Sequence, residues 1–145
     1  MARNFRIKKR KGGFTLIELL VVVAIVGLLA TIAITGTNYV RQRARDSRRV
    51  TDIRTMQKSL ALYFTTKNSY PAASNLCLTN SDSVSQALKQ ESAIAKVPVD
   101  PLASCVSDSN CCFFYSSDGT AYSLRYTLEI DSQVGAKGNH TVGPI

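Results

Sequence analysis

Hydrophobic residues follow two successive patterns along the first half of the chain. Positions 19–40 contain no charged residue, and these 22 positions would span about 33 Å as a helix. That length exceeds the hydrocarbon core of a bilayer, which is about 30 Å thick. Beyond Val40, apolar residues recur at intervals that return them to one helix face. This stripe consists of Ala44, Val50, Ile53, Met56 or Gln57, Leu60, Ala61 and Phe64. The two patterns predict one continuous helix from Phe14 to about Thr66, with a lipid-compatible first half and a second half packed on a small domain.

The clearest strand pattern lies near the end of the chain. Residues 121–130 alternate strictly between apolar and polar side chains. Their apolar face comprises Tyr122, Leu124, Tyr126, Leu128 and Ile130. Asp118-Gly119 is a typical hairpin turn, and residues 112–116 supply the preceding strand. We expect the long helix to pack on the apolar face, which makes the fold class α+β with a small antiparallel sheet.

The segments between helix and hairpin carry weaker signals. The helix should end within residues 67–71, because a residue that precedes proline disfavours helical angles. A loop is expected up to about Asn80, followed by a short helix capped by Ser81 or Ser83 and running to about Ala93. The glycine-rich tail after Asp131, which contains His140, is expected to be an irregular surface segment.

Four cysteines lie beyond the apolar run, at Cys77, Cys105, Cys111 and Cys112. Their spacing matches no zinc motif, and the chain has a single histidine. Disulfides are therefore favoured, and they place the C-terminal region outside the cytoplasm. Neighbouring cysteines on a strand point to opposite faces, so we expect one of the adjacent pair to bond Cys105 and the other to bond Cys77.

The net charge of +8 is concentrated near the N-terminus. Six basic residues precede position 13, and a second basic cluster follows the apolar run. This second cluster comprises Arg41, Arg43, Arg45, Arg48, Arg49, Arg54 and Lys58. It is open to three interpretations: a solvated helix face, ion pairing between subunits, or a nucleic-acid-binding strip. The absence of interleaved aromatic side chains argues against nucleic acid as a partner.

Residues 11–20, with the sequence KGGFTLIELL, resemble the processing site of type IV prepilins and pseudopilins. The resemblance implies that a prepilin peptidase cuts between Gly13 and Phe14 and that the new N-terminus of Phe14 is methylated. It also implies that Glu18 contributes to filament assembly together with the Phe14 amine. An acidic residue in an apolar helix costs about 2–3 kcal/mol at the bilayer centre, so neutralisation by an amine of a neighbouring subunit is plausible chemistry. The alternative is a Glu18 carboxylate that reaches the lipid headgroups and has no further role.

The run of residues 45–71 is similar to the corresponding part of major pseudopilins and small pilins. The family resemblance implies a leader at residues 1–13, a membrane and filament-core helix at 14–40, and an extracytoplasmic globular domain at 41–145. The expected partners are further copies of the chain in a homopolymeric helical filament, the prepilin peptidase, the inner-membrane assembly machinery and the lipid bilayer. The expected location is the cytoplasmic membrane, with the N-terminus inside, and later an extracellular pilus.

A structural role is therefore expected: a type IV pilus subunit, or alternatively a type II secretion pseudopilin or a membrane-anchored binding domain that never polymerises. No catalytic constellation stands out, and no cofactor or metal site is expected. The calcium loop of major pseudopilins cannot be mapped, because Asp108, Asp118 and Asp131 are scattered.

Overall fold

The computed structural model describes residues 13–105, 108 and 111–145, apart from the side chains of residues 32–36. The expected leader at residues 1–13 therefore lies outside the described residues, except for Gly13. The chain divides into two compact units, Met1–Asn38 and Tyr39–Ile145, and each is considered by itself.

Helix α1 comprises Leu16–Lys67, which confirms the predicted long helix. Thr15 begins it, because its hydroxyl accepts a hydrogen bond from the Glu18 amide at 3.3 Å. Asn68 follows its end with φ of 54°, a left-handed conformation that terminates helices. Among the residues whose side chains are described, no helical stretch has the length and apolarity required to cross a membrane.

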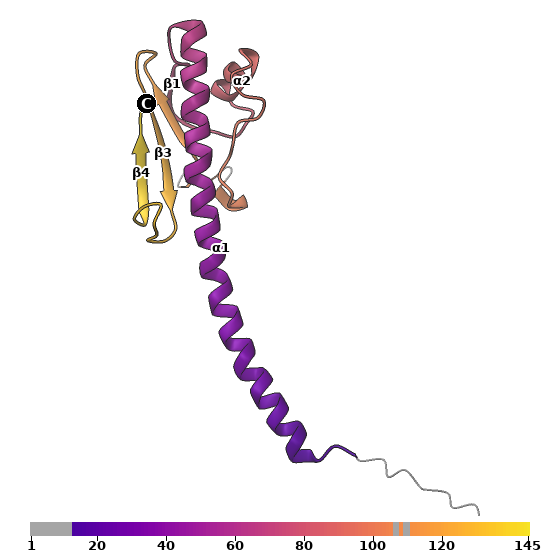
Figure 1. Cartoon of the computed structure of the whole chain (residues 1–145). Coiled ribbons are helices and arrows are strands. Elements are labelled where there is room, and N and C mark those ends of the chain that lie inside the picture. The colour runs from indigo at the N-terminus through magenta and orange to yellow at the C-terminus, as the bar shows by residue number, and fades with distance from the viewer. Residues whose placement is uncertain (1–12, 106–107, 109–110) are drawn as a thin grey trace, which may run out of the picture. The chain divides into compact units, whose positions relative to one another are not determined.

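A four-stranded antiparallel sheet, in the order β1-β2-β3-β4, lies in the second unit (Figure 1). The strands are β1 (Ala73–Cys77), β2 (Phe114–Ser117), β3 (Tyr122–Leu128) and β4 (Gly138–Val142). The predicted hairpin is confirmed as β2 and β3 joined through Asp118-Gly119. The predicted loop before Asn80 and irregular tail after Asp131 are wrong, because β1 pairs with β2 and β4 pairs with β3.

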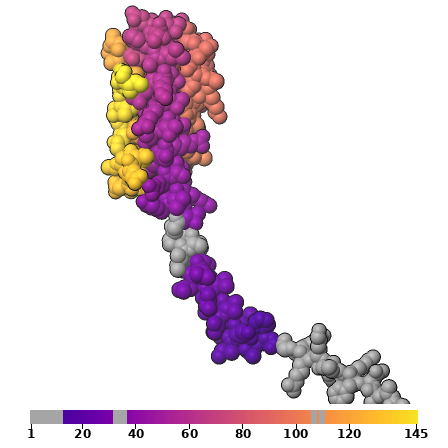
Figure 2. Space-filling view, in the orientation of Figure 1, coloured from indigo at the N-terminus to yellow at the C-terminus, as the bar shows by residue number. Residues whose placement is uncertain are grey.

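In the second unit, α1 lies between the sheet and the segment that carries α2 (Ser83–Gln90), as Figures 1 and 2 show. The hydrophobic core fills the contacts between these three parts. From α1 it receives Ile53, Met56 and Leu60. From β3 it receives Tyr122, Leu124, Tyr126 and Leu128, four members of the predicted apolar face; Ile130, the fifth, lies beyond β3 and outside this core. The α2 segment supplies Leu78, Val84, Leu88 and Val97. Asp82, rather than either predicted serine, caps α2 by accepting hydrogen bonds from Ser85.

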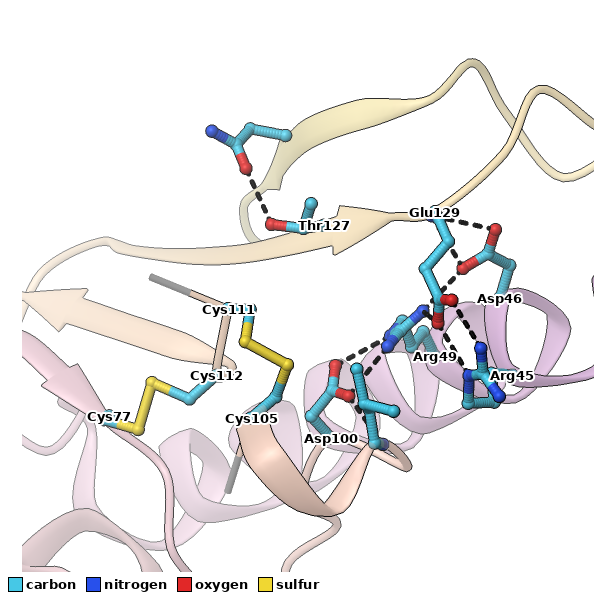
Figure 3. Close-up of a disulfide and its surroundings, with 12 residues drawn as sticks. Arg45, Asp46, Arg49, Cys77, Asp100, Cys105, Cys111, Cys112, Thr127 and Glu129 are labelled. Carbon is cyan, nitrogen blue, oxygen red and sulfur yellow. Dashed lines mark hydrogen bonds and ion pairs between the residues drawn. A yellow bond between two sulfur atoms is a disulfide. The ribbon is translucent and has the colours of Figure 1, made fainter. Parts of the chain in front are cut away.

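Two disulfides fasten the C-terminal region, as the sequence predicts (Figure 3). Cys112 bonds Cys77 and thereby links the segment before β2 to the end of β1, whereas Cys111 bonds Cys105 at the end of a short 3-10 helix, Ala103–Cys105. The expectation of an irregular segment around His140 is wrong. This residue lies in β4, where its ring stacks on Tyr126 with a centroid distance of 5.4 Å.

Candidate functional site: the N-terminal end of α1

The predicted cleavage and assembly residues lie at the start of α1. Gly13 and Phe14 precede the helix, and a Cβ at Gly13 would meet no other atom within 4 Å. The Phe14 side chain is 79% exposed. Glu18 stands in the first helical turn, where the positive end of the helix dipole favours a carboxylate. This backbone is accessible to a peptidase, and within the described residues Glu18 forms no ion pair.

An uncovered apolar surface follows these residues. All described side chains from Phe14 to Thr31 are exposed, including Leu16 at 82% and Ile17 at 71%. The exposure surrounds the helix, so it is not a stripe directed at a core of the same chain. A continuous apolar surface of this kind marks contact with lipid or with other protein chains.

Two members of the basic cluster that follows the apolar run, Arg45 and Arg49, fit none of its three interpretations. Both bind carboxylates of their own chain. Arg49 is 1% exposed, and its guanidinium binds Asp100 through two hydrogen bonds of 2.7 and 2.8 Å. The same guanidinium donates to Asp46 at 2.7 Å and to Glu129 at 2.6 Å. We call Arg45, Asp46, Arg49, Asp100 and Glu129 the Arg49 cluster (Figure 3).

The Arg49 cluster joins three separate parts of the second unit. Arg45 binds both oxygens of Glu129, which follows β3, at 2.7 and 2.5 Å. Asp46 accepts hydrogen bonds from the backbone amides of Glu129 and Ile130. Asp100 brings in the loop after α2. These ion pairs lie within one chain, so Arg45 and Arg49 hold α1 against the sheet and the loop.

The electrostatics of this cluster favour its charged forms. Arg45 hydrogen bonds lower the pKa of Glu129 from its ordinary value of 4.5 to about 2, with further help from Arg49 and against the effect of burial. Burial opposes the charge on Arg49, but hydrogen bonds to Asp100 and Glu129 outweigh it and raise the Arg49 pKa. Breaking such a buried pair by removing one partner is strongly destabilising.

Sequence reasoning missed the Arg49 cluster, although the spacing contains a signal. Asp46, Arg49, Ile53, Met56 and Leu60 are separated by three or four residues and share one face of α1. Apolarity alone defined the predicted stripe, so Asp46 and Arg49 were left out of it. The other residues of the basic cluster are exposed, as a solvated helix face requires: Arg41, Arg43, Arg48, Arg54 and Lys58.

Comparison with known proteins gives a consistent result. Residues 8–34 match the prokaryotic N-terminal methylation motif. The chain is 34% identical to the Type II secretion system core protein G of Aeromonas hydrophila over 64 residues, or 44% of this chain and 45% of the relative. It is 37% identical to the Type IV major pilin protein PilA of Myxococcus xanthus over 73 residues, or 50% of this chain and 33% of the relative.

The chain thus spans less than half the length of these two relatives. A third alignment is more extensive: 27% identity over 135 residues to the Type II secretion system core protein G of Vibrio cholerae, covering 90% of this chain and 88% of the relative. No solved structure matches the chain. The methylation motif, the long helix with its exposed apolar start and the disulfide-fastened antiparallel sheet agree with these similarities, which support a relationship of the chain to type IV pilins and pseudopilins.

Proposed function

We propose that this protein is a filament subunit that is cleaved between Gly13 and Phe14, methylated at Phe14, and polymerised through the apolar part of α1. One observation carries the proposal. The segment from Phe14 to Thr31 is mostly apolar, and yet every described side chain in it is exposed. In the precursor this surface is covered by the inner membrane, and in the filament by the same surface of other copies. Helix packing then replaces lipid contacts.

Glu18 sets the axial register in this proposal. Its carboxylate has no ion-pair partner among the described residues, and Glu18 follows Phe14, the residue that would carry the new amine, by four positions. In an apolar filament core an unpaired carboxylate is unfavourable, so the amine of a neighbouring copy is the natural partner.

The first test is mass spectrometry of the N-terminal peptide of material sheared from whole cells. The proposal expects a peptide that begins at methylated Phe14, and loss of filaments in the Glu18→Ala variant while cleavage continues. Glu18→Asp is the matched control, because it keeps the charge and should retain part of the assembly. Retention of residues 1–13 in the functional protein would instead indicate a membrane-tethered domain that does not polymerise.

A type IV pilus on the cell surface is the first candidate for the filament. A type II secretion pseudopilus is the second, supported by the nearly full-length similarity to protein G of Vibrio cholerae. The two candidates differ in location. Abundant processed subunit in the sheared fraction supports the pilus, whereas processed subunit that stays with the envelope supports the pseudopilus.

A further inference from the structure

The sheet has an outer face, turned away from the core, whose composition is unusual. Tyr122, Leu124 and Tyr126 belong to the core, so the intervening Ser123 and Arg125 of β3 lie on the outer face. Arg125 is paired in register with Phe114 on one side and with Thr141 on the other, and Ser123 is paired with Ser116. This face thus combines one cation with several hydroxyl groups.

Arg125 is held in place but carries no counter-charge. Its guanidinium carbon lies 4.3 Å from the centroid of the Phe114 ring, a cation–π contact. One terminal nitrogen donates to the Asn75 side-chain oxygen at 3.2 Å, and the backbone N–H of Asn75 donates to the Ser116 hydroxyl at 2.8 Å. Among the described residues no carboxylate pairs with Arg125, whereas Arg49 binds three. The remaining guanidinium donors are available to a ligand.

Two hollows meet at this position. The first, of about 150 Å³, is lined by Asn75, Phe114, Ser116, Ser123, Arg125 and Thr141. The second, shallower and of about 480 Å³, shares Ser116 and Ser123 with the first and extends past Ser74 and Ser117 to Asp118. The two hollows adjoin at these shared residues, and we call them together the serine trough.

The volumes of the two hollows and the charges beside them indicate the size and the charge of a ligand that would fit the serine trough. The hollow at Arg125 has the volume of about five water molecules, so it fits one small group of a larger molecule. A guanidinium with free donors matches the planar geometry of a carboxylate. The larger hollow is lined by serines and ends at a carboxylate that repels a second anion. The Ser117 hydroxyl already donates to the Ala121 carbonyl and accepts from Gly119, whereas the Ser116 hydroxyl accepts from the backbone of Asn75 and keeps its own proton to donate.

We propose that the serine trough binds an acidic saccharide, with the sugar carboxylate on Arg125 and the ring hydroxyls on the serines. An acidic side chain from another copy is disfavoured as the occupant, because most carboxylates of the second unit are engaged. Asp46, Asp100 and Glu129 belong to the Arg49 cluster, Glu91 pairs with Lys67, and Asp118 accepts three hydrogen bonds within its own turn. The trough lies wholly within the second unit, so this binding does not depend on polymerisation.

The test is a nuclear magnetic resonance titration of the detergent-solubilised full chain with sodium glucuronate, in parallel with glucose and sodium acetate. Glucuronate should shift the amide signals of Ser116, Ser123, Arg125 and Thr141. Arg125→Gln should weaken glucuronate binding about tenfold or more, since hydrogen bonds to charged groups contribute most. Lys58→Gln, which removes an exposed cation from α1, is the matched control and should leave binding unchanged.

Ser123→Ala separates the contribution of the trough hydroxyls from that of the charge. It should weaken glucuronate binding and leave acetate binding unaltered. Equal affinity for acetate and glucuronate would reduce the site to simple anion capture and overturn the saccharide proposal. Tighter binding of a short aspartate-containing peptide, or glucuronate binding unchanged by Arg125→Gln, would overturn it as well.

Discussion

Helix α1 contains two regions that use apolar residues in opposite ways. From Leu16 to Thr31 the apolar side chains are exposed around the helix. From Asp46 to Leu60 the buried positions form one stripe, and even the charged members of that stripe are paired within the chain. The second region therefore completes its own interactions, whereas the first obtains its stability from something outside the chain. Substitutions in the two regions should accordingly affect different measurements.

The largest difference should come from Arg49→Met, compared with Arg54→Met at an exposed position of the same helix. Loss of Arg49 leaves Asp46 and Asp100 buried without their cation, which should lower the free energy of unfolding by about 3–5 kcal/mol. The Arg54 variant should change it by less than about 0.5 kcal/mol. Urea unfolding followed by tyrosine circular dichroism measures both, and equal values would contradict a structural role for the Arg49 cluster.

A leucine in each region gives the next test. Leu124→Ala creates a cavity in the core of the second unit and should lower the free energy of unfolding by about 2–5 kcal/mol. Leu28→Ala removes an exposed side chain and should leave unfolding of the detergent-solubilised chain unchanged, while it reduces the yield of sheared filaments. A core-like loss of stability at Leu28 would show that the first region is covered by its own chain.

The two disulfides should differ in their contributions to the free energy of unfolding, by less than the two leucine substitutions do. The Cys77–Cys112 bond spans a sequence separation of 35, and the Cys105–Cys111 bond a separation of 6. In the chain-entropy description the longer loop should contribute about 1–1.5 kcal/mol more. Thermal unfolding of the variants C77S/C112S and C105S/C111S measures this difference, and a greater loss in the second variant would contradict loop entropy as its source.

The smallest expected effect depends on pH. The pKa of Glu129 is lowered in the folded state, so its contribution is complete above its ordinary value of 4.5 and is lost as the pH falls toward about 2. Because Glu129 is partly exposed, solvent screening reduces this contribution to about 1 kcal/mol. Between pH 5 and pH 2, the wild-type protein should lose more stability than Glu129→Gln. If the free energies of unfolding of the two proteins fell in parallel with pH, Glu129 would not be the source of the pH dependence.

The sequence predicts the parts of this fold that depend on local patterns. The helix boundary at Lys67, the Asp118-Gly119 turn and the alternating face of β3 follow from neighbouring residues. Strand β1 could not be predicted this way, because Asn75 adopts a φ of 45° and interrupts the strand pattern. Strand β4 likewise has weak local propensity and is defined by its pairing with β3.

The same distinction holds for the candidate sites. The proposed processing segment from Gly13 to Glu18 is contiguous, so its pattern can be recognised from the sequence alone. The Arg49 cluster and the serine trough each combine residues more than 40 positions apart, such as Arg49 with Asp100 and Asn75 with Arg125. The Arg49 cluster exists only after α1 has packed on the sheet and on the loop after α2, and the serine trough only after the strands have paired.

The arrangement of the cysteines has a consequence for the maturation of the protein. The Cys105–Cys111 bond lies entirely inside the loop closed by Cys77–Cys112, and Cys111 and Cys112 are neighbours. An exchange of partners between these neighbours would yield two incorrect bonds and no free thiol. A thiol assay would not distinguish that product from the native protein. Proteolytic mapping of the linked peptides is therefore the appropriate quality control for recombinant material, and a disulfide isomerase is the appropriate co-expression partner.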